Sequence, residues 1–134
     1  MDLRSCVRSV PDFPVEGILF RDITPMLRDP AALRESIRQL AALVEGEKID
    51  RVVGMESRGF IYGVPLAIEL GCGFVPLRKP GKLPREVLAR EYALEYGTAT
   101  LEVHVEDIEA GERVLIVDDL LATGGTARTA ADMV

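Results

Sequence analysis

Two adjacent carboxylates and a glycine-rich turn stand close together near the end of the chain. Asp118 and Asp119 directly follow the apolar run 114–117, and Thr123-Gly124-Gly125-Thr126 comes shortly afterwards. Glycines let backbone N–H groups crowd around an anion, and the start of a helix adds partial positive charge, so the turn suits a phosphate. The acids would repel a bare phosphate unless they face hydroxyl groups or a bridging metal ion. The pattern indicates a site for a sugar phosphate with a diol, together with magnesium.

Other phosphate-binding motifs fit this segment less well. A Walker A loop ends in Gly-Lys followed by Ser or Thr, and no lysine lies between Gly111 and Val134. The dinucleotide fingerprint GxGxxG does not occur in the sequence. An ordinary strand with a capped helix after it is the simpler alternative, but it leaves the order of strand, acid pair and glycine turn unexplained.

Positive charge gathers in a different part of the chain. Residues 78–85, called the basic segment below, carry four basic side chains and no acidic one, on a chain with a formal charge of −6. This local excess suits a small polyanion, although a solvated cationic loop is an equally simple interpretation. Arg58 follows a short apolar run, so its guanidinium could bind phosphate oxygens at a strand end; a plain surface arginine is the alternative.

The elements that must position these residues alternate between strand and helix. Apolar runs predict strands at 51–55, 74–77 and 114–117, and helical spacing predicts helices from Asp29-Pro30 to Gly46, from Phe60 to Leu70, and from Thr126 onward. Because Pro65 lies inside the second helix, we expect its first part to be irregular. The succession predicts an α/β fold with a mainly parallel sheet flanked by helices. Ligands of such sheets bind at the carboxyl ends of the strands, which directs attention to the loops after Met55, Leu77 and Val117.

The stretch between the predicted strands 74–77 and 114–117 shows weaker hydrophobic periodicity. From Arg78 to about Glu91 no period is visible, and the glycines and prolines predict a long mobile loop. Residues 100–106 alternate between apolar and polar, which predicts a half-exposed strand with His104 on its polar face. We interpret His104, the only histidine, as a solvated strand residue and not as a catalyst.

Length and composition limit the class of protein. The chain has 134 residues, 48% of them hydrophobic and 28% charged, so we expect a single domain over residues 1–134. No stretch is long and apolar enough for a membrane span, and the N-terminus lacks the features of a secretory signal, so we expect a cytoplasmic protein. The negative net charge argues against nucleic acid as a partner. Cys6 and Cys72 stand alone, so neither a disulfide framework nor a zinc site is expected.

The run from Val114 to Ala127 resembles the phosphoribosyl pyrophosphate signature of the type I phosphoribosyltransferases. Its Leu-Leu-Ala-Thr-Gly-Gly-Thr part is similar to the form found in the adenine-specific members. Three further segments resemble that family in the correct order: residues 11–25 its base-binding segment, Glu56 to Phe60 its pyrophosphate loop, and residues 78–84 with 94–97 its flexible lid. The resemblance implies the type I fold and a pentosyltransferase of purine salvage, which converts adenine and phosphoribosyl pyrophosphate into AMP and pyrophosphate.

The resemblance also implies roles for individual residues. Asp118 and Asp119 would hold the ribose hydroxyls, and Ala122, Thr123, Gly124, Gly125 and Thr126 would wrap the 5-phosphate. Arg58 would clamp pyrophosphate beside Ser57, with Arg78 and Lys82 as further contacts and Lys79 as a weaker one. Glu95, next to Tyr96, would stand over the reacting centre, and main-chain groups around Leu19 and Arg21 would recognise adenine.

Several other expectations come from the same resemblance. Mg²⁺ would be carried by phosphoribosyl pyrophosphate, with no metal ligand of the protein's own assigned. A homodimer would let Arg78 and Lys82 serve the neighbouring site, and the bond between Glu56 and Ser57 would be cis. The family continues beyond Val134, so the domain is expected to lack a C-terminal strand and tail. A phosphoribosyltransferase for another base, or a regulator that only senses phosphoribosyl pyrophosphate, are the alternatives.

Overall fold

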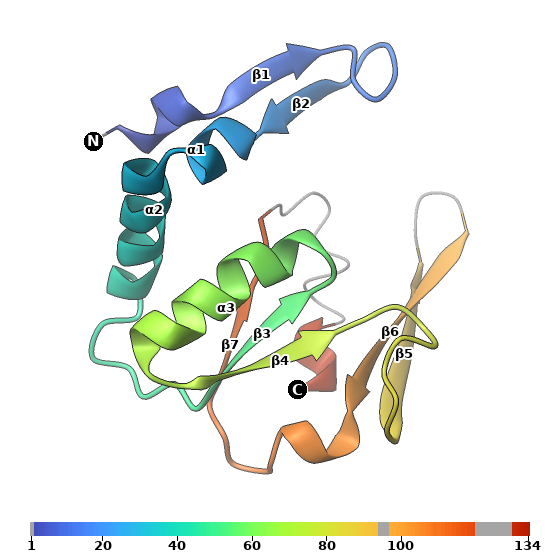
Figure 1. Ribbon diagram of the computed structural model, residues 1–134. Helices are drawn as coiled ribbons and strands as arrows, with labels where there is room; N and C mark the ends of the chain where they lie inside the picture. The colour runs from blue at the N-terminus through green and yellow to red at the C-terminus, as the bar shows by residue number, and fades with distance from the viewer. Residues whose placement is uncertain (1, 94–96, 120–129) are drawn as a thin grey trace. The chain divides into compact units, whose positions relative to one another are not determined.

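A computed structural model describes residues 2–93, 97–119 and 130–134. The chain divides into two compact units, Met1–Glu45 and Gly46–Val134, and each is described here by itself. Figure 1 labels their helices and strands. Among the helices of the described ranges, none is long and apolar enough to cross a membrane.

The first unit is a hairpin followed by two helices. After the 3₁₀ turn η1 (Leu3–Cys6), strands β1 (Arg8–Pro11) and β2 (Leu19–Asp22) pair antiparallel, and helices α1 (Thr24–Arg28) and α2 (Pro30–Ala42) follow. The predicted cap of α2 is confirmed, because Asp29 Oδ1 accepts hydrogen bonds from the main-chain N–H groups of Ala31 (2.9 Å) and Ala32 (3.3 Å). The helix ends at Ala42, before the predicted Gly46, whose φ of 82° suits the turn that follows.

The second unit is built on a parallel sheet, as predicted. Its strands β3 (Arg51–Met55), β4 (Gly73–Leu77) and β7 (Val114–Val117) lie in the order β4-β3-β7, with β3 parallel to both neighbours. The central strand β3 is almost wholly buried, which explains why its sequence is continuously apolar and does not alternate.

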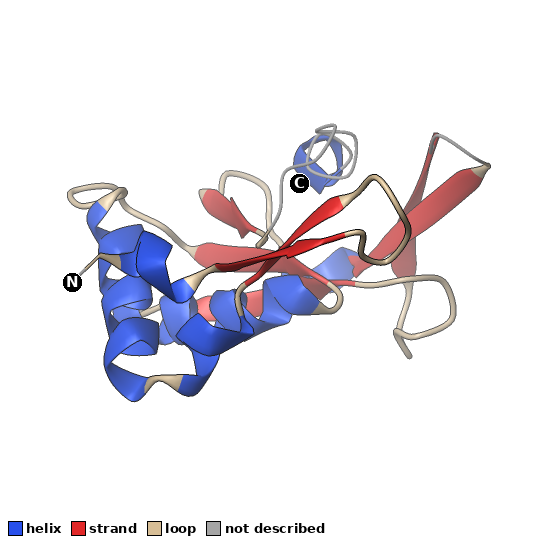
Figure 2. Ribbon diagram, turned by 90° about the horizontal axis from the view of Figure 1, so that it is seen from above, coloured by secondary structure: helices blue, strands red, loops and turns tan. Residues whose placement is uncertain are grey.

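Helix α3 (Arg58–Leu70) covers one face of this sheet (Figure 2). It begins at Arg58 instead of the predicted Phe60 and ends at Gly71, whose φ is 75°, as a left-handed C-cap. The expected irregularity at Pro65 is wrong, because the helix runs through this residue. Burial of Tyr62, Leu66 and Ala67 against the sheet outweighs the hydrogen bond that proline cannot make.

Glycines allow α3 to approach the sheet closely. A Cβ atom on Gly54 of β3 would lie 2.7 Å from the carbonyl oxygen of Gly59, and one on Gly63 would meet the ring of Phe74. A Cβ on Gly59 would lie 3.2 Å from the carbonyl oxygen of Val117 at the end of β7. The first turn of α3 is therefore seated directly over the ends of β3 and β7.

The main hydrophobic core lies on the other face of the sheet. There Ala130 and Met133, in the helical residues 130–133, join one buried cluster with side chains from the strands: Val53, Met55, Val75, Leu77, Leu101 and Val103. Both faces of β3 are thus covered, as expected for a parallel sheet.

A second hairpin corrects the sequence prediction for residues 78–91. Strands β5 (Val87–Ala93) and β6 (Thr98–His104) pair antiparallel where the prediction had a mobile loop up to Glu91. Most side chains of β5 are exposed, so its sequence lacks the alternation that would have revealed it. Strand β6 ends at His104, and the 3₁₀ turn η2 (Val105–Asp107) follows. The interpretation of His104 as solvated is also wrong, because the residue is only 8% exposed.

Candidate functional site

The carboxyl ends of β3, β4 and β7 lie at one edge of the sheet, because these strands are parallel and in register (Figure 1). The residues that leave this edge are Glu56, Ser57 and Arg58 after β3, Arg78 and Lys79 after β4, and Asp118 and Asp119 after β7. The loops after Met55, Leu77 and Val117, to which the sequence directed attention, thus all begin at this edge.

The acid pair is constrained by its own backbone. The main-chain N–H of Asp119 donates to Asp118 Oδ1 at 2.8 Å, and the Asp119 side chain is only 8% exposed. The pKa of the Asp118 carboxyl is raised, first by its partial removal from water and then by the neighbouring Asp119 carboxyl. Two carboxylates so close together favour a ligand that brings hydroxyl donors or positive charge between them.

Arg58 joins the acid pair to the start of α3. Its Nε atom lies 3.1 Å from Asp119 Oδ2, while about half of the Arg58 side chain stays exposed. Gly59 packs closely against Val117, and this contact brings the start of α3 near the loop after β7. A cation and an anion from different strands thus stand side by side, which suits a ligand with both phosphate oxygens and hydroxyl groups.

A second ion pair links the loop after β3 to the basic segment. Glu56 Oε1 accepts from Arg78 Nε at 3.1 Å and from the main-chain N–H of Lys79 at 3.0 Å. The pKa of the Glu56 carboxyl is lowered, first by the N–H of Lys79 and then by Arg78. The guanidinium carbon of Arg78 also lies 5.9 Å from the ring centre of Phe60.

Sequence reasoning assigned no role to Glu56 or Phe60. Both belong to the segment 56–60 that carried the resemblance, but their contacts with Arg78 depend on the pairing of β3 with β4. The cis peptide bond between Glu56 and Ser57 was predicted and is confirmed.

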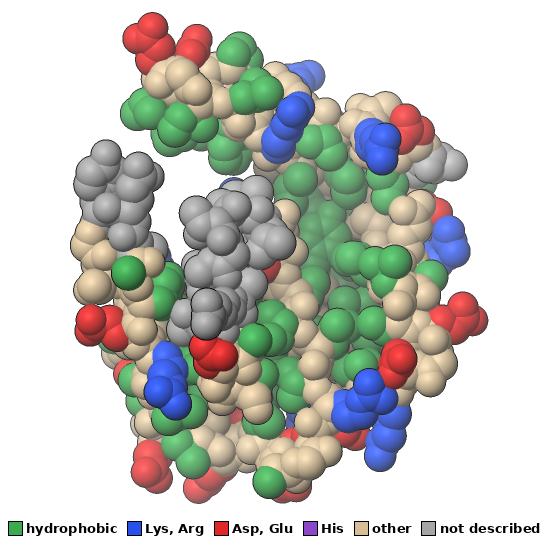
Figure 3. Space-filling model, turned by 180° about the vertical axis from the view of Figure 1, so that it is seen from behind, with side chains coloured by type: hydrophobic (Ala, Val, Ile, Leu, Met, Phe, Trp, Pro, Cys, Tyr) green, Lys and Arg blue, Asp and Glu red, His purple; other side chains and the backbone are tan. Residues whose placement is uncertain are grey.

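The first half of the basic segment is attached to β6 through Glu102. Arg78 and Glu102 exchange two main-chain hydrogen bonds of 2.9 and 2.7 Å, and the N–H of Gly81 donates to Glu102 Oε1 at 3.0 Å. Lys82 is exposed beside this attachment. Figure 3 shows one face of the molecule, on which Lys and Arg side chains stand singly or in small groups among acidic and hydrophobic ones.

The remaining predicted site residues belong to the first unit or lie outside the described residues. Leu19 and Arg21 belong to β2 of the first unit, where Leu19 is half-exposed, Arg21 Nη1 donates to Ser9 Oγ, and Phe20 packs edge-to-face on Phe13 with ring centres 5.1 Å apart. The predicted residues Glu95, Tyr96, Ala122, Thr123, Gly124, Gly125 and Thr126 lie outside the described residues.

Comparison with known proteins gives a consistent result. The family model of the phosphoribosyl transferase domain matches residues 24–134. The adenine phosphoribosyltransferase of Methylococcus capsulatus is 61% identical over 132 residues, which cover 98% of this chain and 77% of that protein. The adenine phosphoribosyltransferase of Gloeobacter violaceus is 60% identical over 134 residues, which cover 100% of this chain and 78% of that protein.

Solved structures agree in fold as well as in sequence. The crystal structure of adenine phosphoribosyltransferase from Thermoanaerobacter pseudethanolicus matches with a TM-score of 0.93 and 54% identity, over 98% of this chain and 76% of that one. The Saccharomyces cerevisiae adenine phosphoribosyltransferase, crystallised with an iminoaltritol bisphosphate and adenine, matches with a TM-score of 0.92 and 44% identity, over 98% and 77%.

Proposed function

This chain belongs to the phosphoribosyl transferase family, among the type I adenine phosphoribosyltransferases, and from that premise we propose how its residues divide the work of the reaction. The enzyme transfers ribose 5-phosphate from phosphoribosyl pyrophosphate to adenine, and the products are AMP and pyrophosphate. Positive charge develops on the ribose as pyrophosphate leaves, so the site must stabilise an anion and keep water away.

Arg58 and Arg78 take the leaving pyrophosphate in this proposal, with Ser57 and Lys82 as further contacts. The observation that carries it is the 3.1 Å contact of Arg58 Nε with Asp119 Oδ2 at the strand-end edge. This contact sets a phosphate-binding cation directly beside a hydroxyl-binding acid, as the junction between ribose and pyrophosphate requires. Glu56 holds Arg78 at Nε, which leaves its terminal amino groups to face phosphate oxygens.

Asp118 and Asp119 bind the ribose hydroxyls, and Ala122 to Thr126 wrap the 5-phosphate. Support comes from the acid pair directly after β7, where its carboxylates can accept from a diol. Glu95, next to Tyr96, is assigned to the base proton or to the charge on the sugar. Main-chain groups around Leu19 and Arg21 bind adenine.

Magnesium fits these residues as an ion that enters with phosphoribosyl pyrophosphate. Asp118 and Asp119 offer the hard oxygen donors that Mg²⁺ prefers, and Mg²⁺ commonly uses one or two carboxylates together with substrate phosphates. Over residues 2–93, 97–119 and 130–134, no three Asp, Glu, His or Cys side chains gather into a metal site of the protein's own. When bound, the ion neutralises phosphate charge.

At the level of the whole chain we infer one domain that acts as a cytoplasmic homodimer. The family model spans residues 24–134 and so includes parts of both compact units, which supports a single functional domain. The exposed Lys82 supports a basic segment that can reach another molecule.

Mass spectrometry of the products tests the proposed function. The chain is incubated with magnesium phosphoribosyl pyrophosphate and, in separate reactions, adenine, hypoxanthine, guanine, xanthine or orotate. AMP is expected from adenine, much less product from the other bases, and little AMP without magnesium. Equal turnover of another base would contradict the adenine assignment, and binding of phosphoribosyl pyrophosphate without any product would indicate a regulator.

A further inference from the structure

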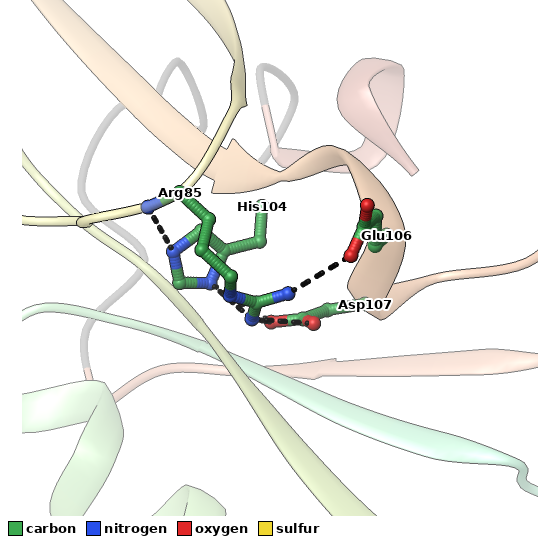
Figure 4. A network of polar contacts seen from close by, with 4 residues as sticks. All are labelled: Arg85, His104, Glu106 and Asp107. Atoms are coloured by element: carbon green, nitrogen blue, oxygen red, sulfur yellow. Dashed lines mark hydrogen bonds and ion pairs between the residues drawn. The ribbon is translucent and has the colours of Figure 1, made fainter.

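A polar cluster lies at the base of the second hairpin, and the reaction described above does not use it. Figure 4 shows its four members: Arg85 from the end of the basic segment, His104 from the end of β6, and Glu106 and Asp107 from η2. The His104 side chain is 9% exposed and that of Asp107 26%, whereas Glu106 is 78% exposed. His104 is therefore the buried centre of the cluster.

We assign the tautomer of His104 from its hydrogen bond with the Arg85 main chain. Its Nε2 accepts the main-chain N–H of Arg85 at 3.3 Å, so that nitrogen must present a lone pair. The hydrogen then resides on Nδ1, which donates to Asp107 Oδ2 at 2.9 Å. Arg85 Nη2 also lies 2.9 Å from Nδ1, but in this tautomer both atoms carry hydrogen, so this approach is not counted as a hydrogen bond. Nε2 is thus hydrogen-bonded to the basic segment, and Nδ1 is hydrogen-bonded to η2.

The Asp107 carboxylate also accepts hydrogen bonds from the Arg85 guanidinium. Arg85 Nη2 lies 2.8 Å from Asp107 Oδ1 and 3.0 Å from Oδ2, whereas its Nη1 is 3.4 Å from the exposed carboxylate of Glu106. An exposed pair at that distance contributes little, so the link through Asp107 dominates. Hydrogen bonds from Arg85, then from His104, also lower the pKa of the Asp107 carboxyl.

These contacts fix the far end of the basic segment. Its near end is held at Arg78, by main-chain hydrogen bonds to Glu102 and by the Glu56 carboxylate. Its far end is held at Arg85 by His104, which lies two positions along β6 from Glu102. Both ends of the basic segment are therefore hydrogen-bonded to β6, and Lys82 is exposed between these two attachment points.

We propose that His104 is a positioning residue for pyrophosphate binding. Through its bond to the Arg85 main chain and its link to Asp107, it holds the basic segment in the arrangement that presents cations to the leaving group. This role rests on the proposed function of Arg78 and Lys82 as pyrophosphate contacts. His104 itself touches no reactant.

Two amide substitutions distinguish the hydrogen bond of His104 with the Arg85 main chain from its hydrogen bond with Asp107. His104→Asn keeps a donor at the position of Nδ1 for Asp107 but removes the acceptor for the Arg85 N–H. His104→Gln places an amide oxygen near the position of Nε2 and can keep that acceptor. Val103→Ala is the matched control, because Val103 is the neighbouring buried residue of β6 and belongs to the apolar core. It should lower the melting temperature without touching the polar cluster.

The variants are compared by kinetics, by calorimetric titration with magnesium pyrophosphate, and by deuterium exchange of residues 78–86. For His104→Asn we expect a roughly tenfold higher KM for phosphoribosyl pyrophosphate, a matching loss of pyrophosphate affinity, and faster exchange. The KM for adenine should stay near that of the unmodified chain. His104→Gln should recover most of the affinity, and Val103→Ala should leave both KM values unchanged.

The result that overturns the role of His104 is a His104→Asn variant that differs from Val103→Ala in none of these measurements. Equal losses in His104→Asn and His104→Gln, together with a changed KM for adenine, would indicate a purely structural residue and overturn it too. A failure of the proposed function looks different, because the unmodified chain would then neither bind pyrophosphate nor form AMP. That outcome removes the pyrophosphate role, whatever the exchange rates show.

Discussion

Single residues of the site work in pairs of opposite charge. Arg58 contacts Asp119, and Arg78 contacts Glu56, so each of these two arginines has a carboxylate of the same chain as its neighbour. Such pairs fix the direction of long side chains that would otherwise lose much conformational freedom when a ligand binds. Removing the acid should therefore impair the adjacent cation as well as its own contacts.

The acid pair gives the first prediction. The double substitution Asp118→Asn and Asp119→Asn should weaken binding of magnesium phosphoribosyl pyrophosphate by roughly a hundredfold, because two charged acceptors for the ribose hydroxyls are lost. The fold should persist, since the raised pKa of Asp118 means that its ionised form does not stabilise the folded state at neutral pH. Isothermal calorimetry measures the affinity and circular dichroism the fold. Undiminished affinity in a folded double variant would show that the ribose assignment is wrong.

Glu56 gives a prediction about pH. Because its pKa is lowered in the folded state, its ionised form stabilises the fold above the ordinary pKa of glutamate, and this contribution is lost as the pH falls through the lowered value. Glu56→Gln should therefore cost roughly 1 kcal/mol of unfolding free energy at pH 7 and much less at an acidic pH at which the folded chain has its Glu56 carboxyl protonated. Urea unfolding at both pH values measures it. Glu91→Gln on the exposed side of β5 is the control, and an equal, pH-independent cost at Glu56 would contradict the argument.

At the level of elements, α3 packs closely on the sheet because glycines at the contact have no side chain. Gly54→Ala should lower the unfolding free energy by about 2 kcal/mol, because its Cβ would lie 2.7 Å from the Gly59 carbonyl oxygen, and backbone cannot move aside as a flexible side chain can. Gly73→Ala is the matched control, since its Cβ would meet only the Arg51 side chain, at 3.9 Å. Thermal and urea unfolding compare the two. Equal stability of both variants would mean that α3 can shift without cost.

The elements also show what the sequence could and could not predict. Strands 51–55 and 114–117 were predicted with their observed bounds, because buried parallel strands read as continuous apolar runs. Strand β5 was missed because its side chains are mostly exposed, and Pro65 suggested an irregularity that packing overrides. The sequence supplied no signal for the contacts of the buried His104, because its partner Arg85 lies 19 positions away along the chain.

The same limit applies to the site. The acid pair and Arg58 could be found from residue type and their place after predicted strands, and in the structure Arg58 Nε lies 3.1 Å from Asp119 Oδ2. The contacts of Glu56 and Phe60 with Arg78 could not be found in this way, since they arise from the register between β3 and β4. The roles assigned to the site residues all stay predictions, those of the acid pair and Arg58 as much as those of Leu19, Arg21, Glu95 and residues 122–126.

For the whole molecule, the homodimer makes a quantitative prediction. If Arg78 and Lys82 serve the neighbour's site, inactive Arg78→Ala and inactive Asp119→Ala chains, refolded together, should form heterodimers with one intact site and one that carries both lesions. Activity should return to about half of the unmodified value per heterodimer. Native mass spectrometry confirms the heterodimers, and each variant refolded alone is the control. Heterodimers without any activity would show that the basic segment serves its own chain, to which Glu56 already binds it.

The strand order β4-β3-β7 also bears on how the molecule is made. The central strand β3 meets β4 across the single helix α3, whereas β7 reaches β3 only after the second hairpin has been synthesised, when Val114 comes to lie beside Arg51. Contacts between residues so distant in the chain close late and slowly. During synthesis the half of the site that carries Arg58 and Arg78 therefore exists before the half that carries Asp118 and Asp119. We therefore expect a nascent chain to form the loops of Arg58 and Arg78, to which we assign anion binding, before β7 brings the proposed sugar-binding acids beside them.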